Sequence, residues 1–170
     1  MTTIPNWDNI QESGSKRIKA GGYICKINSV KDVTDKQYLL VELDVADGEF
    51  AKYYEEMMAQ KGFWGLKHFA SYKEKAQGLF KHFISCVEKS NSNYKFDFNE
   101  STLVNKFVGI VLGFEEYIGN DGAIKQRVKV VDILPVEDIK NGNFEIPELK
   151  KLAIEQQVQE EEIPEDELPF

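Results

Sequence analysis

The sequence predicts a mainly β domain of five antiparallel strands, with one amphipathic helix between the third and fourth strands. Three observations indicate this class. Several segments rich in β-forming residues are separated by turn-forming residues, one of them alternates cleanly between apolar and polar side chains, and one long segment has helical periodicity. With 170 residues, of which 42% are hydrophobic, the chain can bury a core of its own.

The first two strands are predicted to form a hairpin. Residues 1–20 form a polar arm in which Ile4 and Trp7 are candidate anchors, and residues 21–33 follow as a β-rich strand opened by two glycines. After a short turn, residues 37–45 alternate so that one face carries Leu39, Val41, Leu43 and Val45. These four side chains are expected in the core.

A connection with a short helix around residues 51–60 leads to a third strand, 63–72. Ser71 and Glu74 then fit a capping box that starts a helix of about 18 residues. Its apolar residues recur at helical spacing: Ala76, Leu79, Phe80, Phe83, Ile84 and Val87. The opposite face carries Lys75, Lys81, His82 and Lys89. The pattern predicts a helix packed on a sheet.

Two further strands complete the domain. Residues 106–118 form the fourth, in which Gly109 and Gly113 indicate a bend or bulge at a barrel corner, and residues 123–136 form the fifth after a tight turn. The predicted order of elements along the chain is three strands, one helix and two strands. This is the order of the OB-fold, a five-stranded antiparallel barrel. The predicted division is an arm (1–20), the barrel domain (21–140), a connecting segment (141–154) and a disordered acidic tail (155–170).

Composition and motifs exclude several classes of function. No apolar run is long enough to span a bilayer and the N-terminus lacks a signal peptide, so a cytoplasmic location is expected. Cys25 and Cys86 are expected to be free buried thiols. No phosphate-binding loop, metal-ligand spacing or catalytic constellation is visible, which predicts no enzyme, no cofactor and no metal site. Acidic pairs such as Asp44/Asp47 and Glu115/Glu116 could hold Mg²⁺ in a nuclease, although strand ends and turn flanks explain them better.

The charge is unevenly distributed along the chain. The net charge is −8, but residues 155–170 contain seven acidic residues and no basic ones. Residues 61–90 carry six lysines against Glu74 and Glu88, and both histidines lie in the same segment. The acidic total therefore leaves a polyanionic partner open.

Aromatic and basic residues are interleaved in a way that favours single-stranded nucleic acid. Such a ligand needs cations along its phosphates and aromatic faces on which bases stack. In the last strand, Lys125, Arg127 and Lys129 alternate and so share one face, while Val128 and Val130 face the core. The candidate DNA-binding residues are Lys26, Lys61, Trp64, Lys67, His68, Phe69, Tyr72, Lys73, Lys75, Tyr117, Lys125, Arg127 and Lys129.

Structural explanations of the same residues stay open. Strand alternation sends either Phe63 and Phe69 or Trp64 and Tyr72 toward the core, and the sequence does not decide which pair. The alternating cations of the last strand could also be a solvated face without function.

Three segments resemble a family of phage and prophage OB-fold single-stranded DNA-binding proteins from Gram-positive hosts. They are SYKEKAQGLFKHFISCVEKSN, VGIVLGFEEYIGNDG and WDNIQESGSKRIKAGGYICKI, and the resemblance covers most of residues 6–150. The ending EDELPF is similar to the tail of bacterial single-stranded DNA-binding proteins. That similarity implies that Phe170 enters an apolar pocket on a partner, with acidic residues at its basic rim. The partner-binding residues it implies are Asp166, Glu167, Leu168, Pro169 and Phe170.

The predicted function is non-enzymatic, largely sequence-independent binding of single-stranded DNA during phage DNA replication or recombination. The tail is expected to recruit replication, recombination or repair proteins. A strand-annealing recombination protein, a small Mg²⁺-dependent nuclease and a protein adaptor without nucleic-acid binding are the alternatives. The oligomeric state, including homo-oligomerisation, is left open.

Overall fold

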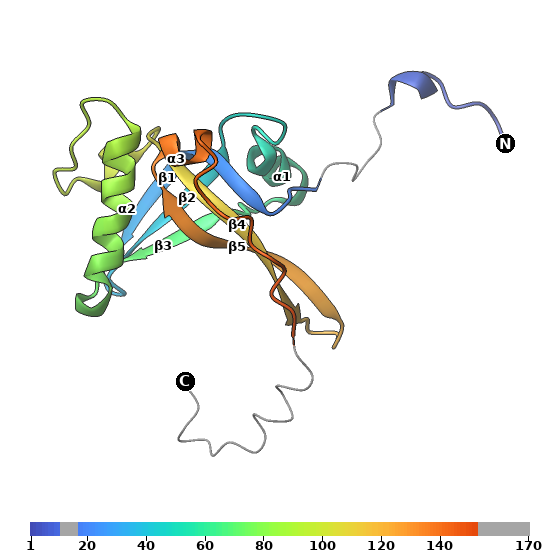
Figure 1. The fold of residues 1–170 in the computed structure, drawn as a ribbon. Helices are drawn as coiled ribbons and strands as arrows, with labels where there is room; N and C mark the ends of the chain where they lie inside the picture. Colours follow the sequence, from blue (N-terminus) through green and yellow to red (C-terminus); the bar gives the residue numbers. More distant parts are fainter. Residues whose placement is uncertain (11–16, 153–170) are drawn as a thin grey trace, which may run out of the picture.

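The computed structural model describes residues 1–10 and 17–152, and its centre is one five-stranded antiparallel sheet (Figure 1). The order across the sheet is β3-β2-β1-β4-β5. The strands are β1 (Gly21–Val33), β2 (Tyr38–Val45), β3 (Lys67–Ser71), β4 (Phe107–Ile118) and β5 (Ile124–Leu134). The predicted five antiparallel strands are therefore confirmed.

Three helices join this sheet, so the fold is mixed α/β rather than mainly β. They are α1 (Tyr53–Lys61), α2 (Gln77–Ser90) and α3 (Val136–Lys140), with 3₁₀ turns at Trp7–Asn9, Glu74–Ala76 and Glu100–Leu103. The turn at Glu74–Ala76 runs directly into α2, which makes one main helical segment between β3 and β4, as predicted. No described helix is long and apolar enough to cross a membrane.

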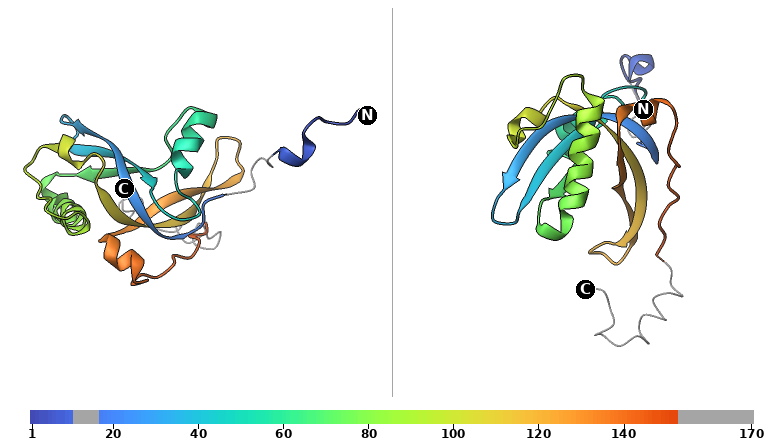
Figure 2. Two further views of the ribbon diagram at one scale, coloured as in Figure 1. Left: turned by 90° about the horizontal axis from the view of Figure 1, so that it is seen from above. Right: turned by 60° about the vertical axis from the view of Figure 1, so that its left-hand side comes forward.

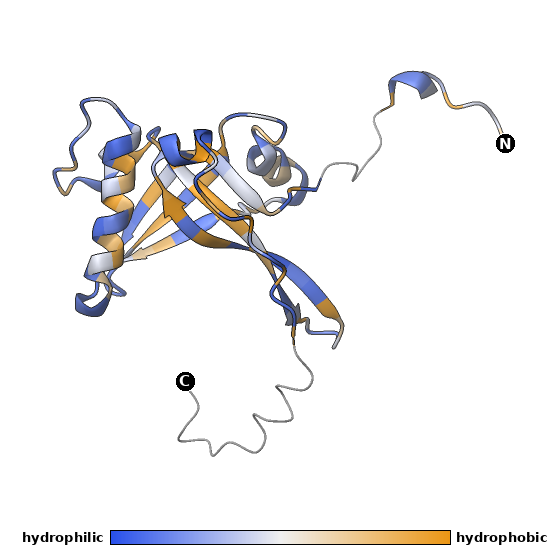
Figure 3. Ribbon diagram, in the orientation of Figure 1, coloured by the Kyte–Doolittle hydropathy of each residue, from blue (hydrophilic) through white to orange (hydrophobic). Residues whose placement is uncertain are grey.

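The core lies on the inner face of the curled sheet (Figure 2). The predicted alternation of β2 is confirmed, since all four expected side chains are buried: Leu39, Val41, Leu43 and Val45. Val108, Ile110 and Leu112 of β4 join them, and α2 adds Phe83, Ile84 and Val87. The hydropathy colouring shows the two-sided character of α2 (Figure 3). Both cysteines are free and buried, as expected.

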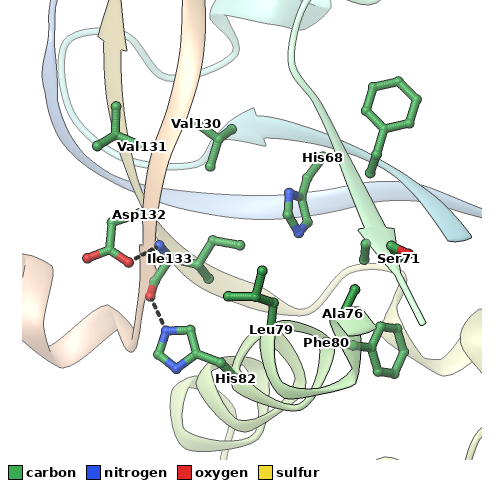
Figure 4. A pocket seen from close by; sticks show the side chains of 12 residues that line it. His68, Ser71, Ala76, Leu79, Phe80, His82, Val130, Val131, Asp132 and Ile133 are labelled. Carbon is green, nitrogen blue, oxygen red and sulfur yellow. Dashed lines mark hydrogen bonds between the residues drawn. The ribbon is translucent and has the colours of Figure 1, made fainter. Parts of the chain in front are cut away.

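The sheet does not close into a barrel. β3 pairs with β2 over five residues and β5 pairs with β4, but β3 and β5 do not pair with each other. Side chains of α2 lie between these two edges, and His82 Nε2 donates to the Ile133 carbonyl oxygen at 2.8 Å (Figure 4). The His82 side chain thereby occupies the Ile133 carbonyl, to which a strand that closed the barrel at β5 would have to hydrogen-bond.

The predicted start of the main helix is wrong in detail. Ser71 is the last residue of β3, where its hydroxyl accepts from the Lys73 amide at 3.3 Å, and the residue preceding the 3₁₀ turn is Lys73, which makes no side-chain cap. Leu79 also departs from the expected apolar face, because it is 77% exposed. It borders the open gap between β3 and β5, where no strand covers it.

A C-terminal segment, residues 143–152, crosses the outer face of the sheet and then follows β4 (Figure 1). Its Lys150 amide donates to the Phe114 carbonyl at 3.0 Å, and its Lys150 carbonyl accepts from the Glu116 amide at 2.9 Å. Phe144 lies against Gly22 and Pro147 lies against Gly113, so a Cβ at either glycine would meet them at 3.0 Å or less.

This close approach revises the expectation for Gly109 and Gly113. A register shift does occur nearby, between Val111 and Leu112. The glycines themselves admit neighbouring segments, with Ile139 of α3 over Gly109 and Pro147 over Gly113.

Candidate nucleic-acid interface

An exposed patch on the outer face of β1, β2 and β3 combines aromatic and basic side chains. We call it the outer platform, and it consists of Lys31, Tyr38, Lys67 and Phe69. Strand register places Lys31 beside Leu40, and Leu40 beside Phe69, in one row across the three strands. Lys67 shares the face because it lies two residues before Phe69 on β3.

Two aromatic rings define the centre of the platform. Phe69 and Tyr38 pack edge to face, with ring centroids 5.4 Å apart and planes at 75°. Phe69 is 57% exposed although it belongs to a paired strand. An exposed ring held by a second ring offers a flat, pre-ordered surface for a stacked base.

The cations around these rings are not paired with acids in the described part of the chain. Lys31 and Lys67 form no salt bridge there, and Lys26 is exposed on the same face of β1, beside Phe107 of β4. Two acids share this face: Glu42 lies opposite Lys67 in the strand register and accepts a hydrogen bond from the Ser29 hydroxyl at 3.1 Å, and Asp44 lies opposite Lys26. Neither acid forms a salt bridge with these lysines in the described residues, so a phosphate backbone could still reach their ammonium groups beside the rings.

The structure decides which aromatic pair of the 63–72 segment faces inward. Trp64 is half-buried and its indole N–H donates to the Leu43 carbonyl at 2.8 Å. Tyr72 donates its hydroxyl to Asp32 at 2.8 Å and packs against Phe80. Both rings therefore hold the fold together, while Phe63 and Phe69 point outward.

His68 also lies on the inner side. Its ring packs on Phe83 with centroids 5.2 Å apart, and burial lowers its pKa to about 4. A neutral, half-buried imidazole is poorly suited to contact phosphate.

The second basic surface lies on the β4–β5 hairpin. We call it the hairpin patch, and it comprises Glu115, Tyr117, Lys125, Arg127 and Lys129, which share the outer face of the two strands. The predicted sharing of one face by the three cations is thus seen, and Val128 and Val130 pack toward the core as expected. The Arg127 guanidinium lies 5.0 Å from the centre of the Tyr117 ring.

Acidic neighbours already engage these cations. Arg127 Nε donates to Glu115 Oε1 at 2.7 Å, and Lys129 Nζ lies 3.7 Å from Glu115 Oε2. The hydrogen bond from Arg127 is the main reason that the pKa of Glu115 is lowered. Lys125 lies 3.6 Å from Asp121. The hairpin patch is therefore less available to phosphate than the sequence alone implies.

The remaining candidates lie elsewhere on the surface. Lys61 is the last residue of α1, and Lys73 and Lys75 are exposed at the turn before α2. α3 and the C-terminal segment cover the outer face between the platform and the hairpin patch, over Gly22, Gly109 and Gly113. The structure thus divides the thirteen candidates among several places and does not join them in one groove.

Sequence reasoning missed several exposed rings and cations. Tyr38 and Lys31 belong to the platform, and their signal was their position on the polar face of two strands whose other face is apolar. Phe98 is 87% exposed and contacts Phe96, with centroids 5.3 Å apart, in the loop after α2. The sequence shows that this loop is aromatic, but no local pattern indicates that the Phe98 ring is exposed.

Possible metal ligands were also considered among the described residues. These residues contain no group of three or more His, Cys, Asp or Glu side chains that could hold a metal ion. Asp44, considered above as a metal ligand, accepts hydrogen bonds from the amides of Val45, Tyr54 and Glu55. Its carboxylate therefore caps the start of α1. The five predicted partner-binding residues, 166–170, lie outside the described residues.

The chain matches no protein-family model and no curated protein. Its function is therefore inferred from the geometry of its own residues.

Proposed function

We propose that this protein binds single-stranded DNA without catalysing a reaction, and that the outer platform is its principal contact. The observation that carries the proposal is the exposed Phe69 ring, braced by Tyr38 and flanked by Lys31 and Lys67, which form no salt bridge within the described residues. A purely structural strand gains nothing from exposing a large apolar ring, whereas a stacked base would cover it.

The connectivity of the sheet supports an OB-type fold for this role. β1 pairs with both β2 and β4, and the main helix joins β3 to β4. We propose that the domain is an OB barrel left open between β3 and β5. The outer face of strands 2 and 3 is the usual ligand surface of OB-folds, and it is the face that carries the platform. The resemblance to phage single-stranded DNA-binding proteins is consistent with this use.

The expected binding is tolerant of sequence. Stacking contributes roughly 1–3 kcal/mol per base whatever the base is, and lysine–phosphate contacts read charge rather than identity. Contacts to about four phosphates would give a log–log salt slope near −3 on single strands. Coating of exposed strands during phage replication or recombination is the corresponding role.

A titration with fluorescently labelled oligo(dT) tests the proposal. Phe69→Ala should weaken binding by roughly 5- to 150-fold, which corresponds to the loss of one stacked base. Phe98→Ala is the control, because it removes an even more exposed ring that lies outside the platform, and it should leave affinity unchanged. Absence of binding at low salt, or equal effects of the two variants, would contradict the proposal.

The same titration separates the alternatives. Shortening of the oligonucleotide in Mg²⁺ would favour a nuclease, and accelerated pairing of complementary strands would favour an annealing protein.

We further propose that the acidic segment 155–170 recruits replication, recombination or repair proteins. Removing residues 166–170 should abolish capture of such host proteins and leave oligo(dT) affinity intact. Capture that survives the deletion would reject this second role.

A further inference from the structure

The gap between the unpaired edges of β3 and β5 is an open cavity of about 230 Å³ (Figure 4). It is lined by residues 68–71 of β3, by α2 and the turn before it, and by residues 130–133 of β5. Among the apolar side chains that face it, Leu79 is 77% exposed, Phe80 and Val130 are half-buried and Ile133 is buried (Figure 4). His68, Ser71, His82 and Asp132 supply the polar part of the lining.

This cavity has the scale of a site for a peptide side chain. It is smaller than the pockets of roughly 300–1,000 Å³ that hold drug-sized ligands. Its walls include two strand edges that pair with no other strand in the described chain, and such edges readily accept an added segment. The site therefore suits a short chain segment with one large apolar side chain.

The N-terminal arm, residues 1–10, is a segment of this kind. Its 3₁₀ turn Trp7–Asn9 is flanked by apolar residues that are all exposed: Ile4 at 45%, Trp7 at 66% and Ile10 at 52%. The body covers none of them, although three large apolar side chains within seven residues are costly to leave in water. The arm is thus an apolar segment that finds no cover in its own chain.

The charges near the two surfaces are also complementary. Within residues 1–10 the only charged side chain is Asp8, directly after Trp7, and the N-terminal ammonium group lies seven residues before it. The turn and helix beside the cavity carry exposed Lys73, Lys75 and Lys81 against one acid, Glu74. Asp132 on the opposite wall is an acid, so the arm is expected to place Asp8 toward the α2 side.

We propose that the arm of one copy docks into the β3–β5 cavity of a second copy, with the Trp7 ring entering beside Leu79. Because the arm and the cavity are different surfaces of the same chain, each copy can donate one arm and receive another. Two copies can therefore exchange arms in a closed dimer, or the contacts can continue into larger rings and open chains. The contact does not depend on nucleic acid.

Sedimentation of the full chain over a range of concentrations tests this assembly. The wild-type protein should form dimers or larger assemblies as its concentration rises. Trp7→Ala and Leu79→Glu should each weaken self-association by about tenfold or more, since each removes a large apolar contact. Both positions are exposed in the single chain, so neither change should disturb folding.

Mixing the two variants gives the sharper result. Leu79→Glu retains an arm and Trp7→Ala retains a cavity, so an equimolar mixture should stop at a heterodimer. Ile118→Glu is the control for adding charge at an exposed apolar position, here on the distant hairpin, and should assemble like the wild type.

Three outcomes would overturn the proposal. They are a wild-type protein that stays monomeric, assembly that survives both Trp7→Ala and Leu79→Glu, and a mixture that grows past a dimer. A monomer in which Leu79→Glu alters the fluorescence of Trp7 would show that the arm folds back into its own cavity, and would equally reject exchange between copies.

Discussion

At the scale of single residues, hydrogen bonding distinguishes two tyrosines that look alike in the sequence. Tyr54 is almost fully buried and its hydroxyl has no hydrogen-bond partner among the described residues. Tyr72 is half-buried and its hydroxyl donates to Asp32. Burying an unpaired hydroxyl costs free energy, whereas a satisfied hydrogen bond contributes about 1 kcal/mol.

Removing the two hydroxyls should therefore have opposite effects. We expect Tyr54→Phe to raise the free energy of unfolding by about 0.5–2 kcal/mol, because the unpaired group disappears. Tyr72→Phe should lower it, because the hydrogen bond to Asp32 is lost. Urea denaturation monitored by circular dichroism measures both, and equal changes in the two variants would refute this assignment of partners.

The buried imidazole of His68 should make stability depend on pH. Its folded pKa, about 4, lies below the ordinary value near 6.5, so the unfolded chain binds a proton more readily. The stabilisation is present above the unfolded pKa and is lost as the pH falls toward the folded pKa. Between about pH 7 and pH 5 the loss from this group should be about 2 kcal/mol.

His68→Phe isolates this contribution. The variant replaces the titrating ring by one that can still pack on Phe83. Its loss of stability between the two pH values should be smaller than that of the wild type by about 2 kcal/mol. The same pH dependence in both proteins would show that His68 is not the titrating group.

At the scale of secondary-structure elements, glycine contacts explain how the C-terminal segment lies so close to the sheet. A Cβ at Gly22 would approach the Phe144 ring to 2.5 Å. Gly78, near the start of α2, has no neighbour within 4 Å of the position of a Cβ. The first glycine is required by packing and the second is not.

Alanine at these two positions should reveal the difference. Gly22→Ala should destabilise the protein by about 1–3 kcal/mol through overpacking. Gly78→Ala should stabilise it by about 0.5–1 kcal/mol, because alanine has the higher helix propensity. Thermal unfolding of both variants, and of Gly22→Ala combined with Phe144→Leu, tests this. If the second change fails to recover stability, Phe144 is not the obstacle.

At the scale of the whole molecule, charge pairing decides which basic surface is free for a polyanion. The outer platform offers lysines without acidic partners in the described chain, while Glu115 holds Arg127 and Lys129. The hairpin patch thus carries its own counter-ion, and DNA phosphates would have to compete with it.

Neutralising this counter-ion should strengthen the proposed DNA binding. Glu115→Gln should raise oligo(dT) affinity at low salt and steepen the log–log salt slope by about 0.7 for each added phosphate contact. Glu116→Gln removes the same charge on the neighbouring residue, where the carboxylate accepts the Leu152 amide. It should have a smaller effect. Identical salt slopes for the two variants would exclude the hairpin patch from the DNA path.

Much of the secondary structure could be predicted from local patterns. The alternation in β2, the two hairpins and the main helix between β3 and β4 all appear in the structure. Alternation also correctly grouped Lys125, Arg127 and Lys129 on one face. These features depend on near neighbours in the chain, and near neighbours are what periodicity reports.

The candidate site was less predictable, because face and exposure depend on contacts between distant segments. Trp64 is held by the Leu43 carbonyl and Tyr72 by Asp32, so rings proposed for stacking became part of the packing. Tyr38 belongs to the outer platform only because the pairing of β2 with β3 brings its ring against Phe69.

The sequence by itself determined the order of strands and helix, the buried face of β2 and the sidedness of β5. Only the tertiary structure decided that the sheet stays open between β3 and β5, that Phe69 rather than Trp64 faces solvent, and that Glu115 engages the hairpin cations. The physical reason is that side-chain periodicity is set over a few residues. Edge pairing, burial and charge pairing are instead set by segments that meet only after the chain has folded.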